Sequence, residues 1–258
     1  MSDLDLAAFV ASFPWMIFVV GALLSLFLSL ALKPVARRTG WVDKPNFRKI
    51  HKGEIPLIGG WSILAAAIVL QIWGPAEQRA PLGYWIGGLL LFIVAMIDDR
   101  SPIRARYRAL VQLGAAVAGV AIGGQVLPTL GDFLGLGAIS TMWLMVPISI
   151  IGTVAVVNAV NFTDGADGLC GGLSFISLFW FTVALIISSR YAVALHVEPA
   201  PYAASMLPLA AALLGGIAGF LWFNLRSPFR KKAAVFLGDS GSMLLGFTLA
   251  WFSIHVTS

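Results

Sequence analysis

Residues 9–38 read FVASFPWMIFVVGALLSLFLSLALKPVARR, an apolar run from 9 to 32 followed at once by a basic cluster. The run matches the roughly 17–25 residues that a helix needs to cross the hydrocarbon core of a bilayer. Two acidic residues, Asp3 and Asp5, precede it, whereas a cleaved secretory signal begins with basic residues. We therefore predict a retained transmembrane helix with its N-terminus outside the cell.

Seven more apolar runs of similar length follow, at 57–73, 82–97, 110–126, 141–157, 171–188, 203–223 and 242–256. Hydrophobic residues make up 59% of the 258 positions, charged residues only 11%, and the mean hydropathy is +0.90. Soluble domains carry roughly a quarter charged residues, so this composition excludes an ordinary soluble protein. Because the runs are continuous rather than alternating, they favour helices. The sequence predicts an all-α, polytopic membrane protein, one domain over 1–258 with about eight transmembrane helices.

Lysine and arginine are distributed unevenly among the segments that join these runs. If the helices alternate in direction, the inner segments are 33–56, 98–109, 158–170 and 224–237. They hold 15 of the 17 Lys and Arg residues, and only Arg79 and Arg190 fall outside. Such an excess is typical of cytoplasmic loops. Topology thus explains the formal net charge of +5, which gives little support to nucleic-acid binding.

Carboxylates gather at the inner ends of the predicted helices. Three separate segments carry them there, and two more acids, Asp43 and Glu54, lie in the first inner segment. Acidic residues beside hydrocarbon are costly and usually have a partner or a function. The acids at the inner helix ends are Asp98, Asp99, Asp164, Asp167 and Asp239.

The first acidic motif is AMIDDRSPIRARYR, residues 95–108. The adjacent carboxylates of Asp98 and Asp99 repel each other, and a divalent cation or a nearby arginine would relieve that repulsion. The alternative is a pair of acids at a helix end that Arg100 and Arg104 neutralise.

The second motif is NAVNFTDGADGL, residues 158–169, in which Asn158, Asn161, Asp164 and Asp167 recur every three residues. A helical or 3₁₀ arrangement would place these side chains on one face. Four oxygen-bearing side chains on one face suit a hard cation and a polar ligand. A plain hydrophilic turn between two helices is the alternative, although it would not require the carboxamides.

The third motif is VFLGDSGSMLLGF, residues 235–247. Small residues at the start of a helix expose backbone N–H groups to an anion, which the helix dipole also favours. Asp239 would fit such a place if it held a magnesium ion that in turn held a phosphate. Otherwise Asp239 or Ser240 is an ordinary helix cap.

The fourth motif is DKPNFRKIHKGEIPLIGGW, residues 43–61. A basic cluster in it precedes the Gly59–Gly60 pair and consists of Arg48, Lys49, His51 and Lys52. A positive-inside loop explains these charges, and a glycine pair often serves helix packing. Together the four motifs indicate metal-assisted handling of a phosphorylated substrate at the inner membrane surface.

These four motifs resemble, in order, those of the polyprenyl-phosphate N-acetylhexosamine-1-phosphate transferase family, and the first loop resembles its bacterial undecaprenyl-phosphate N-acetylglucosamine-1-phosphate branch. The resemblance implies that undecaprenyl phosphate attacks the sugar-linked phosphorus of UDP-N-acetylglucosamine, giving undecaprenyl-pyrophosphoryl-N-acetylglucosamine and UMP. It places the protein in the bacterial inner (cytoplasmic) membrane, with the site facing the cytoplasm. It also implies the first membrane step of a cell-surface polysaccharide pathway, and leaves open whether this is the O-antigen of lipopolysaccharide, a common surface antigen, teichoic acid or an exopolysaccharide.

The resemblance also implies roles for individual residues. The metal, Mg²⁺ or alternatively Mn²⁺, would be held by Asn161 and Asp239. Asp98 would deprotonate or orient the lipid phosphate as one of three catalytic acids, which are Asp98, Asp99 and Asp164. The uridine would be bound by Asp167 through hydrogen bonds and by Phe236 through stacking, and the phosphates by Arg106 and Arg108.

Members of this family continue beyond the third motif with further helices and a histidine-rich loop, whereas this sequence stops at Ser258. His196 and His255 fall at the outer side in the predicted topology and do not replace that loop. One alternative is therefore a truncated, inactive relative that binds nucleotide or partners. Another is an ion-coupled transporter, which the position of the acids disfavours because transporter sites usually lie near the bilayer midplane. Whether the protein forms a homodimer is left open by the sequence.

Overall fold

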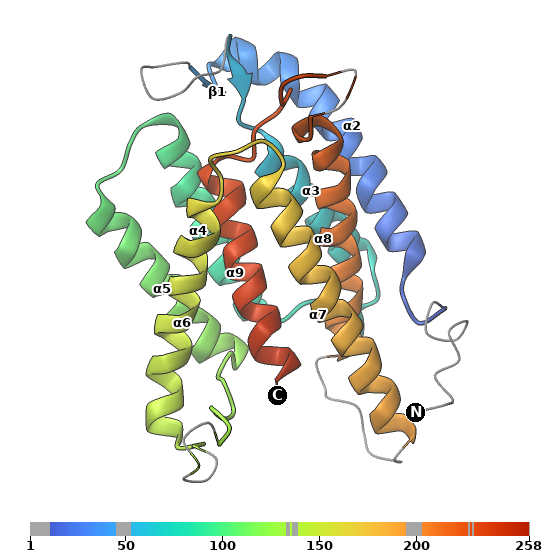
Figure 1. Ribbon diagram of the computed structural model, residues 1–258, viewed down its shortest axis with the longest axis vertical. Helices are drawn as coiled ribbons and strands as arrows, with labels where there is room; N and C mark the ends of the chain where they lie inside the picture. The colour runs from blue at the N-terminus through green and yellow to red at the C-terminus, as the bar shows by residue number, and fades with distance from the viewer. Residues whose placement is uncertain are drawn as a thin grey trace.

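The computed structural model describes residues 11–44, 53–132, 135, 139–194, 203–226, 228 and 230–257. Over these residues the chain forms a bundle of long helices that run alternately up and down (Figure 1). In chain order they are α2 Trp15–Thr39, α3 Gly59–Trp73, α4 Leu82–Arg100, α5 Ala105–Gly123, α6 Met142–Phe162, α7 Leu169–Ala194, α8 Ala203–Asn224 and α9 Gly238–Val256. The remaining elements are a 3₁₀ turn, η1 Ala76–Gln78, and two short antiparallel strands, β1 Val42–Asp43 and β2 Ile55–Pro56.

Five of the described helices are long and apolar enough to cross a membrane, namely α2, α4, α6, α7 and α8. The predicted all-α membrane architecture is therefore confirmed as a class. The apolar helix α3 is shorter, with 15 residues. A total of eight crossings and an N-terminus outside the cell stay predictions.

The segments expected on the inner side meet at one end of the bundle, the upper end in Figure 1. Two of them are shorter than predicted. The segment that was expected to begin at Lys33 begins at Gly40, because α2 continues through Pro34 and ends where Gly40 adopts a left-handed conformation, φ 77°. The loop expected over 158–170 shrinks to 163–168, because α6 extends to Phe162 and α7 begins at Leu169.

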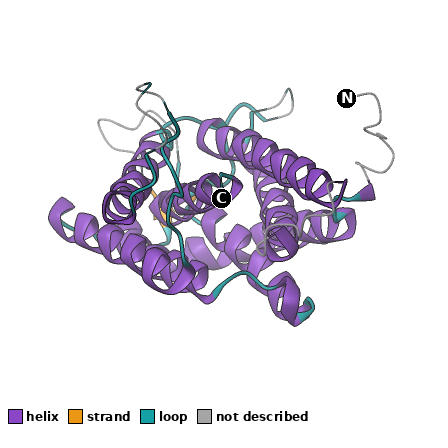
Figure 2. Ribbon diagram, turned by 90° about the horizontal axis from the view of Figure 1, so that it is seen from below, coloured by secondary structure: helices purple, strands orange, loops and turns teal. Residues whose placement is uncertain are grey.

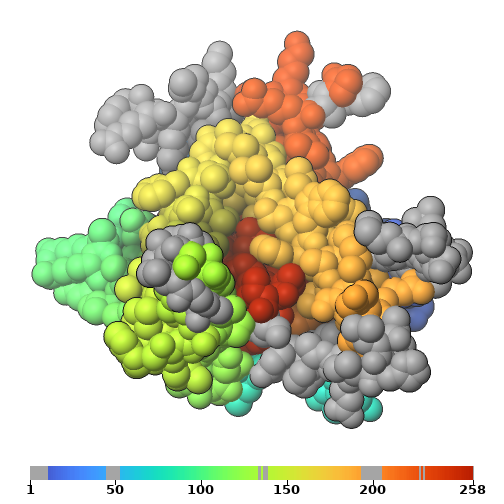
Figure 3. All heavy atoms as spheres, turned by 60° about the horizontal axis from the view of Figure 1, so that its bottom comes forward, coloured from blue at the N-terminus to red at the C-terminus, as the bar shows by residue number. Residues whose placement is uncertain are grey.

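Helix α9 lies in the middle of the bundle, surrounded by α3, α4, α6 and α7 (Figure 2). Most of its side chains are buried, from Ser240 at the upper end to His255 near the lower end. A helix that is apolar on all sides is stable only when neighbours cover every face. At the opposite end of the molecule, α9 lies at the bottom of a recess between α6 and α7 (Figure 3).

The upper end of α9 is fixed by close contact with the start of α3. Gly59 and Gly60 donate their backbone N–H groups to the carbonyls of Phe236 and Leu237, at 2.9 and 3.1 Å. A Cβ atom at Gly60 would lie 2.5 Å from Cα of Gly241, so only glycine permits this approach. The packing interpretation of the Gly59–Gly60 pair is therefore confirmed.

Candidate active site

A cavity of about 1020 Å³ opens where the α6–α7 turn meets the end of α4 and the start of α9. Its lining combines acidic and basic side chains at one end of an otherwise apolar bundle. The acids are Asp43, Asp98, Asp99, Asp164, Asp167 and Asp239, and the basic residues are Arg100, Arg226, Lys231 and Lys232.

Asp98 occupies the last turn of α4 and is buried, with 8% of its surface exposed. Its Oδ1 accepts a hydrogen bond from the Ile103 N–H at 2.5 Å, and its Oδ2 accepts one from Nη1 of Arg108 at 2.7 Å. The first bond holds the α4–α5 turn and the second brings α5 against the site. Each carboxylate oxygen has two lone pairs, so a further bond to a substrate remains possible.

Asp99 is oriented toward α9. Its Oδ1 accepts the backbone N–H of Asp239 at 2.7 Å, and its Oδ2 accepts both the N–H and the hydroxyl of Ser240, at 3.2 and 2.8 Å. These N–H groups belong to the first turn of α9, where no partner exists within the helix. Asp99 therefore caps α9 from a neighbouring helix and holds Asp239 in place.

Asp239 lies between two partners from different helices. Nδ2 of Asn161 on α6 donates to its Oδ1 at 2.9 Å, and Nη1 of Arg108 on α5 lies 3.7 Å from its Oδ2. The same Asn161 nitrogen bonds Oγ of Ser242 at 2.8 Å. Three helices thus converge on the first turn of α9.

Asp164 lies in the α6–α7 turn, and the pKa of its carboxyl is raised to about 8. Burial is the main cause, followed by the negative charges of Asp239, Asp99 and Asp43, while the Gly238 N–H acts in the opposite direction. A raised pKa in a cavity is typical of a functional site.

Asp167 bonds two groups from the segment that follows α8. Its Oδ2 accepts from Nε of Arg226 at 2.8 Å and from the Ala233 N–H at 3.2 Å. Asn224, at the end of α8, accepts the Gly168 N–H at 2.8 Å and donates to the Val235 carbonyl at 2.9 Å. The α6–α7 turn and the segment before α9 are therefore joined side by side.

Phe236 also lines the cavity, and its backbone N–H bonds the Pro56 carbonyl at 2.9 Å. Sequence reasoning did not select Asn224 or Arg226 for the site. Both follow directly after an apolar run, at an inner helix end, which is the same signal that marked the acids.

The two arginines predicted to bind phosphate differ in position. Arg108 contacts Asp98 and Asp239, as described above. The described contacts of Arg106 are with Tyr107, whose hydroxyl lies 3.2 Å from its Nη2 and whose ring centroid lies 4.9 Å from its guanidinium carbon. The structure therefore joins Arg108 to the carboxylates and does not join Arg106 to them.

The predicted spacing of every three residues does not create one metal-binding face. Asn158 pairs with Gln112 on α5, Asn161 faces Asp239, and Asp167 faces Arg226. The helix ends at Phe162, so Asp164 and Asp167 lie in a turn and point to different neighbours.

The donor set around Asp239 fits a hard divalent cation. Mg²⁺ is usually held by one or two carboxylates together with water and substrate phosphates. Asp239 offers a carboxylate. Nδ2 of Asn161 faces that carboxylate, so the amide would have to turn to direct its oxygen at a shared cation. Over the described part of the chain, no three His, Cys, Asp or Glu residues form a metal-binding group.

Other sequence-selected residues lie elsewhere. The basic cluster Arg48, Lys49, His51 and Lys52, like His196, lies outside the described residues. His255 lies near the lower end of α9, where its Nδ1 is 2.9 Å from the Trp251 carbonyl oxygen and its ring stacks on Trp251. It is thus at the opposite end of that helix from Asp239, as expected.

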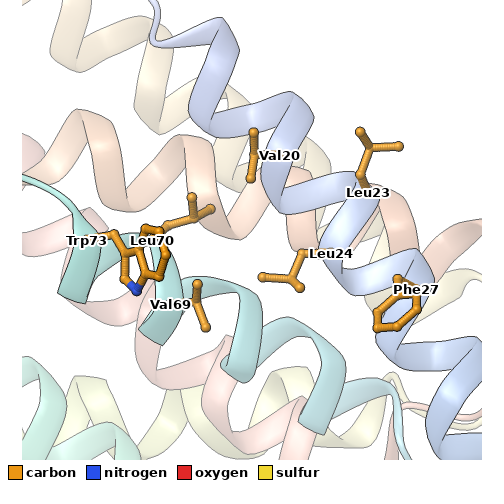
Figure 4. A pocket seen from close by; sticks show the side chains of 7 residues that line it. All are labelled: Val20, Leu23, Leu24, Phe27, Val69, Leu70 and Trp73. Atoms are coloured by element: carbon orange, nitrogen blue, oxygen red, sulfur yellow. The ribbon is translucent and has the colours of Figure 1, made fainter.

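A second, apolar groove of about 440 Å³ lies between α2 and α3. Figure 4 shows its lining, and the residues are Val20, Leu23, Leu24, Phe27, Val69, Leu70 and Trp73. These side chains carry no ionisable group, so the groove offers a surface for hydrocarbon and no chemistry.

Fold and site together define a polytopic helical membrane protein with an acid-lined cavity at one end of its bundle. Within that class, the chain belongs to glycosyl transferase family 4, whose model matches residues 81–257. The family resemblance seen in the four motifs is thereby confirmed.

Named relatives support the same family. The undecaprenyl-phosphate alpha-N-acetylglucosaminyl 1-phosphate transferase of Yersinia pestis is 35% identical over 240 residues, which are 90% of this chain and 59% of that protein. The protein of the same name from Escherichia coli strain K12 is 33% identical over 242 residues, with the same coverage. A probable undecaprenyl-phosphate N-acetylglucosaminyl 1-phosphate transferase of Bacillus subtilis is 28% identical over 92% of this chain and 61% of its own length. The chain therefore spans about 60% of the length of these relatives.

Proposed function

We propose that this protein transfers N-acetylglucosamine 1-phosphate from UDP-N-acetylglucosamine to undecaprenyl phosphate. The products are undecaprenyl-pyrophosphoryl-N-acetylglucosamine and UMP, and the reaction would be the first membrane step of a cell-surface polysaccharide pathway. The site would face the cytoplasm from the bacterial inner membrane. The names of the relatives support the lipid acceptor and the transferred sugar phosphate.

One observation carries this proposal: Asp239, in the first turn of a buried helix, lies between Asn161 and Arg108 beside a cavity lined by six carboxylates and four cations. A transporter site would lie nearer the bilayer midplane, whereas these charges lie at one end of the bundle. Two phosphorylated reactants, one of them a lipid, require such a place between bilayer and water.

In the proposed reaction, an oxygen of the lipid phosphate forms a bond to the sugar-linked phosphorus of the donor. The bond between that phosphorus and the oxygen of UMP breaks, and UMP leaves with the electron pair. Asp98 would accept the proton of the lipid phosphate, and its bond to Arg108 keeps it oriented for this role. Arg108 would offset negative charge that develops on the phosphates.

Mg²⁺, held by Asn161 and Asp239, would supply charge neutralisation for the donor diphosphate. Asp164 would act beside these ligands as a further acid. Asp167 and Phe236 would bind the uridine, with Arg226 moving from Asp167 when the nucleotide enters. Asp99 would act through α9, because its oxygens are bonded to the backbone and hydroxyl of that helix.

A second candidate function is nucleotide binding without turnover. It is favoured by the uridine side of the cavity, because Asp167 and Phe236 line it and are held by contacts separate from those of Asp239.

Measuring UMP release from UDP-N-acetylglucosamine separates the two candidates. The purified chain in detergent should release UMP only when both undecaprenyl phosphate and Mg²⁺ are present. Asp239→Ala should reduce release by a factor of at least about 100, as expected when a group that stabilises transition-state charge is lost. Glu77→Gln, which removes an exposed carboxylate from η1, is the control and should behave as wild type.

Binding of UDP-N-acetylglucosamine without release would favour the second candidate. Wild-type turnover by Asp239→Ala would exclude the metal-ligand role. Release that ignores the lipid would exclude the proposed acceptor.

A further inference from the structure

A reciprocal pair of carboxamides joins α5 to α6 next to the cavity. Nε2 of Gln112 donates to Oδ1 of Asn158 at 3.2 Å, and Nδ2 of Asn158 donates to Oε1 of Gln112 at 2.7 Å. The second hydrogen on Asn158 Nδ2 goes to the Val154 carbonyl at 2.8 Å. Because a carbonyl oxygen can only accept, the Asn158 group that faces it must be the NH2, and this bond sets which way the Asn158 amide faces. Gln112 is only 4% exposed, so water does not compete for the pair.

Each member of the pair lies one helical turn from a residue that holds Asp239. On α5, Gln112 is four positions after Arg108, and on α6, Asn158 is three positions before Asn161, so both relations place side chains on one helix face. Arg108 approaches Oδ2 of Asp239 while Asn161 bonds its Oδ1. The distance between α5 and α6 at this level therefore determines how the two sides of Asp239 are held.

Helices α5 and α6 pack directly against each other, although α5 packs more on α4 and α6 packs more on α9. Polar contacts between the α5 and α6 regions recur far from the cavity, where Nε2 of Gln125 donates to Oγ1 of Thr153 at 3.4 Å and the Leu127 N–H bonds Oγ of Ser149 at 2.8 Å. Among the described polar contacts between these two regions, the Gln112–Asn158 pair is the one nearest the site end.

We propose that the Gln112–Asn158 pair is a positioning clamp that sets the separation of Arg108 and Asn161, and through them the place of Asp239. The pair touches neither substrate nor product in this role. The expected effect on kcat rests on the proposed transfer reaction. The expected effect on the separation of α5 and α6 rests on the geometry alone.

The kinetic test compares Gln112→Leu with Thr153→Val. Leucine is apolar and similar in volume to glutamine, so the helix stays packed in a lipid environment while both clamp bonds are lost. Gln112→Leu should lower kcat by about tenfold or more, because a misplacement of about 1 Å can cost about a hundredfold in rate. The KM for UDP-N-acetylglucosamine should change little, since Asp167 and Phe236 are held by other contacts. Thr153→Val removes the distant contact and should lower Tm without lowering kcat.

The rescue test exchanges the two amides. Gln112→Asn shortens the pair and Asn158→Gln lengthens it, so each change alone should lower kcat. The double variant restores the combined side-chain length and both complementary bonds, and should recover most of the wild-type kcat. The proposal would be overturned if Gln112→Leu and Thr153→Val both lost kcat in proportion to their loss of Tm. It would also be overturned if the double variant folded but did not recover kcat.

A distance measurement separates failure of the clamp from failure of the proposed function. Spin labels at exposed positions near the site end, Leu110 on α5 and Phe162 on α6, report the α5–α6 separation in a chain whose buried Cys170 is replaced by serine. Gln112→Leu should broaden or shift the distance distribution, and Thr153→Val should leave it as in wild type. An unchanged distribution in Gln112→Leu would overturn the clamp even if the protein is active. If the wild-type chain releases no UMP and Gln112→Leu still changes the distribution, the clamp is supported and only the transfer reaction is contradicted.

Discussion

Asp99 is a carboxylate of α4 whose described hydrogen bonds all come from α9. The bonds join its two oxygens to the Asp239 N–H and to the N–H and hydroxyl of Ser240. This carboxylate lines the cavity, and both of its oxygens are already bonded to the start of a helix. Its position supports a role through Asp239, so that the adjacent acids Asp98 and Asp99 have different tasks.

Asp99→Ala should lower the free energy of unfolding by about 1–2 kcal/mol, as loss of a helix cap typically does. Asp99→Asn should cost less, because the remaining oxygen can still accept the Asp239 N–H. Activity should fall in the same order, with alanine worse than asparagine. Chemical denaturation in detergent and UMP release check both results. If both variants lose the same activity while Asp99→Asn is as stable as wild type, Asp99 instead takes part in proton transfer.

Asp164 should make stability depend on pH. Its pKa is about 8 in the folded protein against an ordinary 3.8, so between these values the folded state keeps a proton that the unfolded state has released. The contribution of Asp164 to the free energy of unfolding therefore falls as pH rises from about 4 to about 8, and it is constant outside that window. Asp164→Asn should flatten this slope. Thermal unfolding between about pH 5 and about pH 9, with EDTA present, measures this slope. An unchanged slope in Asp164→Asn would contradict the assignment.

At the scale of elements, the contact between α3 and α9 brings the end of the first loop to the motif that begins α9. The Gly59–Gly60 backbone bonds the segment before α9, and β2 contributes the Pro56 carbonyl to the Phe236 N–H. Residues 180 positions apart in the chain, Gly60 and Ser240, therefore lie within the same small region. The closeness depends on the absence of a side chain at Gly60.

Gly60→Ala should separate α3 from α9, since its Cβ would lie 2.5 Å from Cα of Gly241. Overpacking of this kind costs about 1–3 kcal/mol. Gly152→Ala on α6 is the matched control, because a Cβ there meets nothing within 4 Å. Alanine's better helix propensity should leave that variant unchanged or slightly more stable. Unfolding of both variants in detergent provides the comparison, and equal stability would contradict the close approach.

At the scale of the molecule, the cavity and most of the basic residues lie at the same end of the bundle. The positive-inside rule then predicts that this end faces the cytoplasm. A site that uses a cytoplasmic nucleotide sugar requires the same orientation.

Cysteine labelling tests that orientation with two exposed positions at opposite ends, Lys231 beside the cavity and Met142 at the start of α6. In spheroplasts, a membrane-impermeant thiol reagent should modify Met142→Cys and spare Lys231→Cys until the membrane is opened. Buried Cys170 serves as the unlabelled background in the parent chain. The reverse pattern would place the cavity outside the cell.

The sequence by itself determined the membrane class, the approximate helices and the end of the bundle that carries the acids. Long apolar runs and the uneven distribution of Lys and Arg are local properties, which bilayer thickness and interfacial charge act on directly. The four motifs also sufficed to indicate the family. Boundaries were less well predicted: α2 runs past Lys33 to Thr39 and α6 past Asn158 to Phe162, because capping and packing decide where a helix ends.

Only the tertiary structure decided which partner each polar side chain has. The spacing of Asn158, Asn161 and Asp167 indicated one face, yet they bond Gln112, Asp239 and Arg226, which come from three other segments. Arg106 and Arg108 are similar by sequence, and only Arg108 reaches the carboxylates. Hydrogen bonds and ion pairs act over a few ångströms and depend on direction. The neighbours of a polar group are therefore determined by how the helices pack, which the local pattern of residues does not contain.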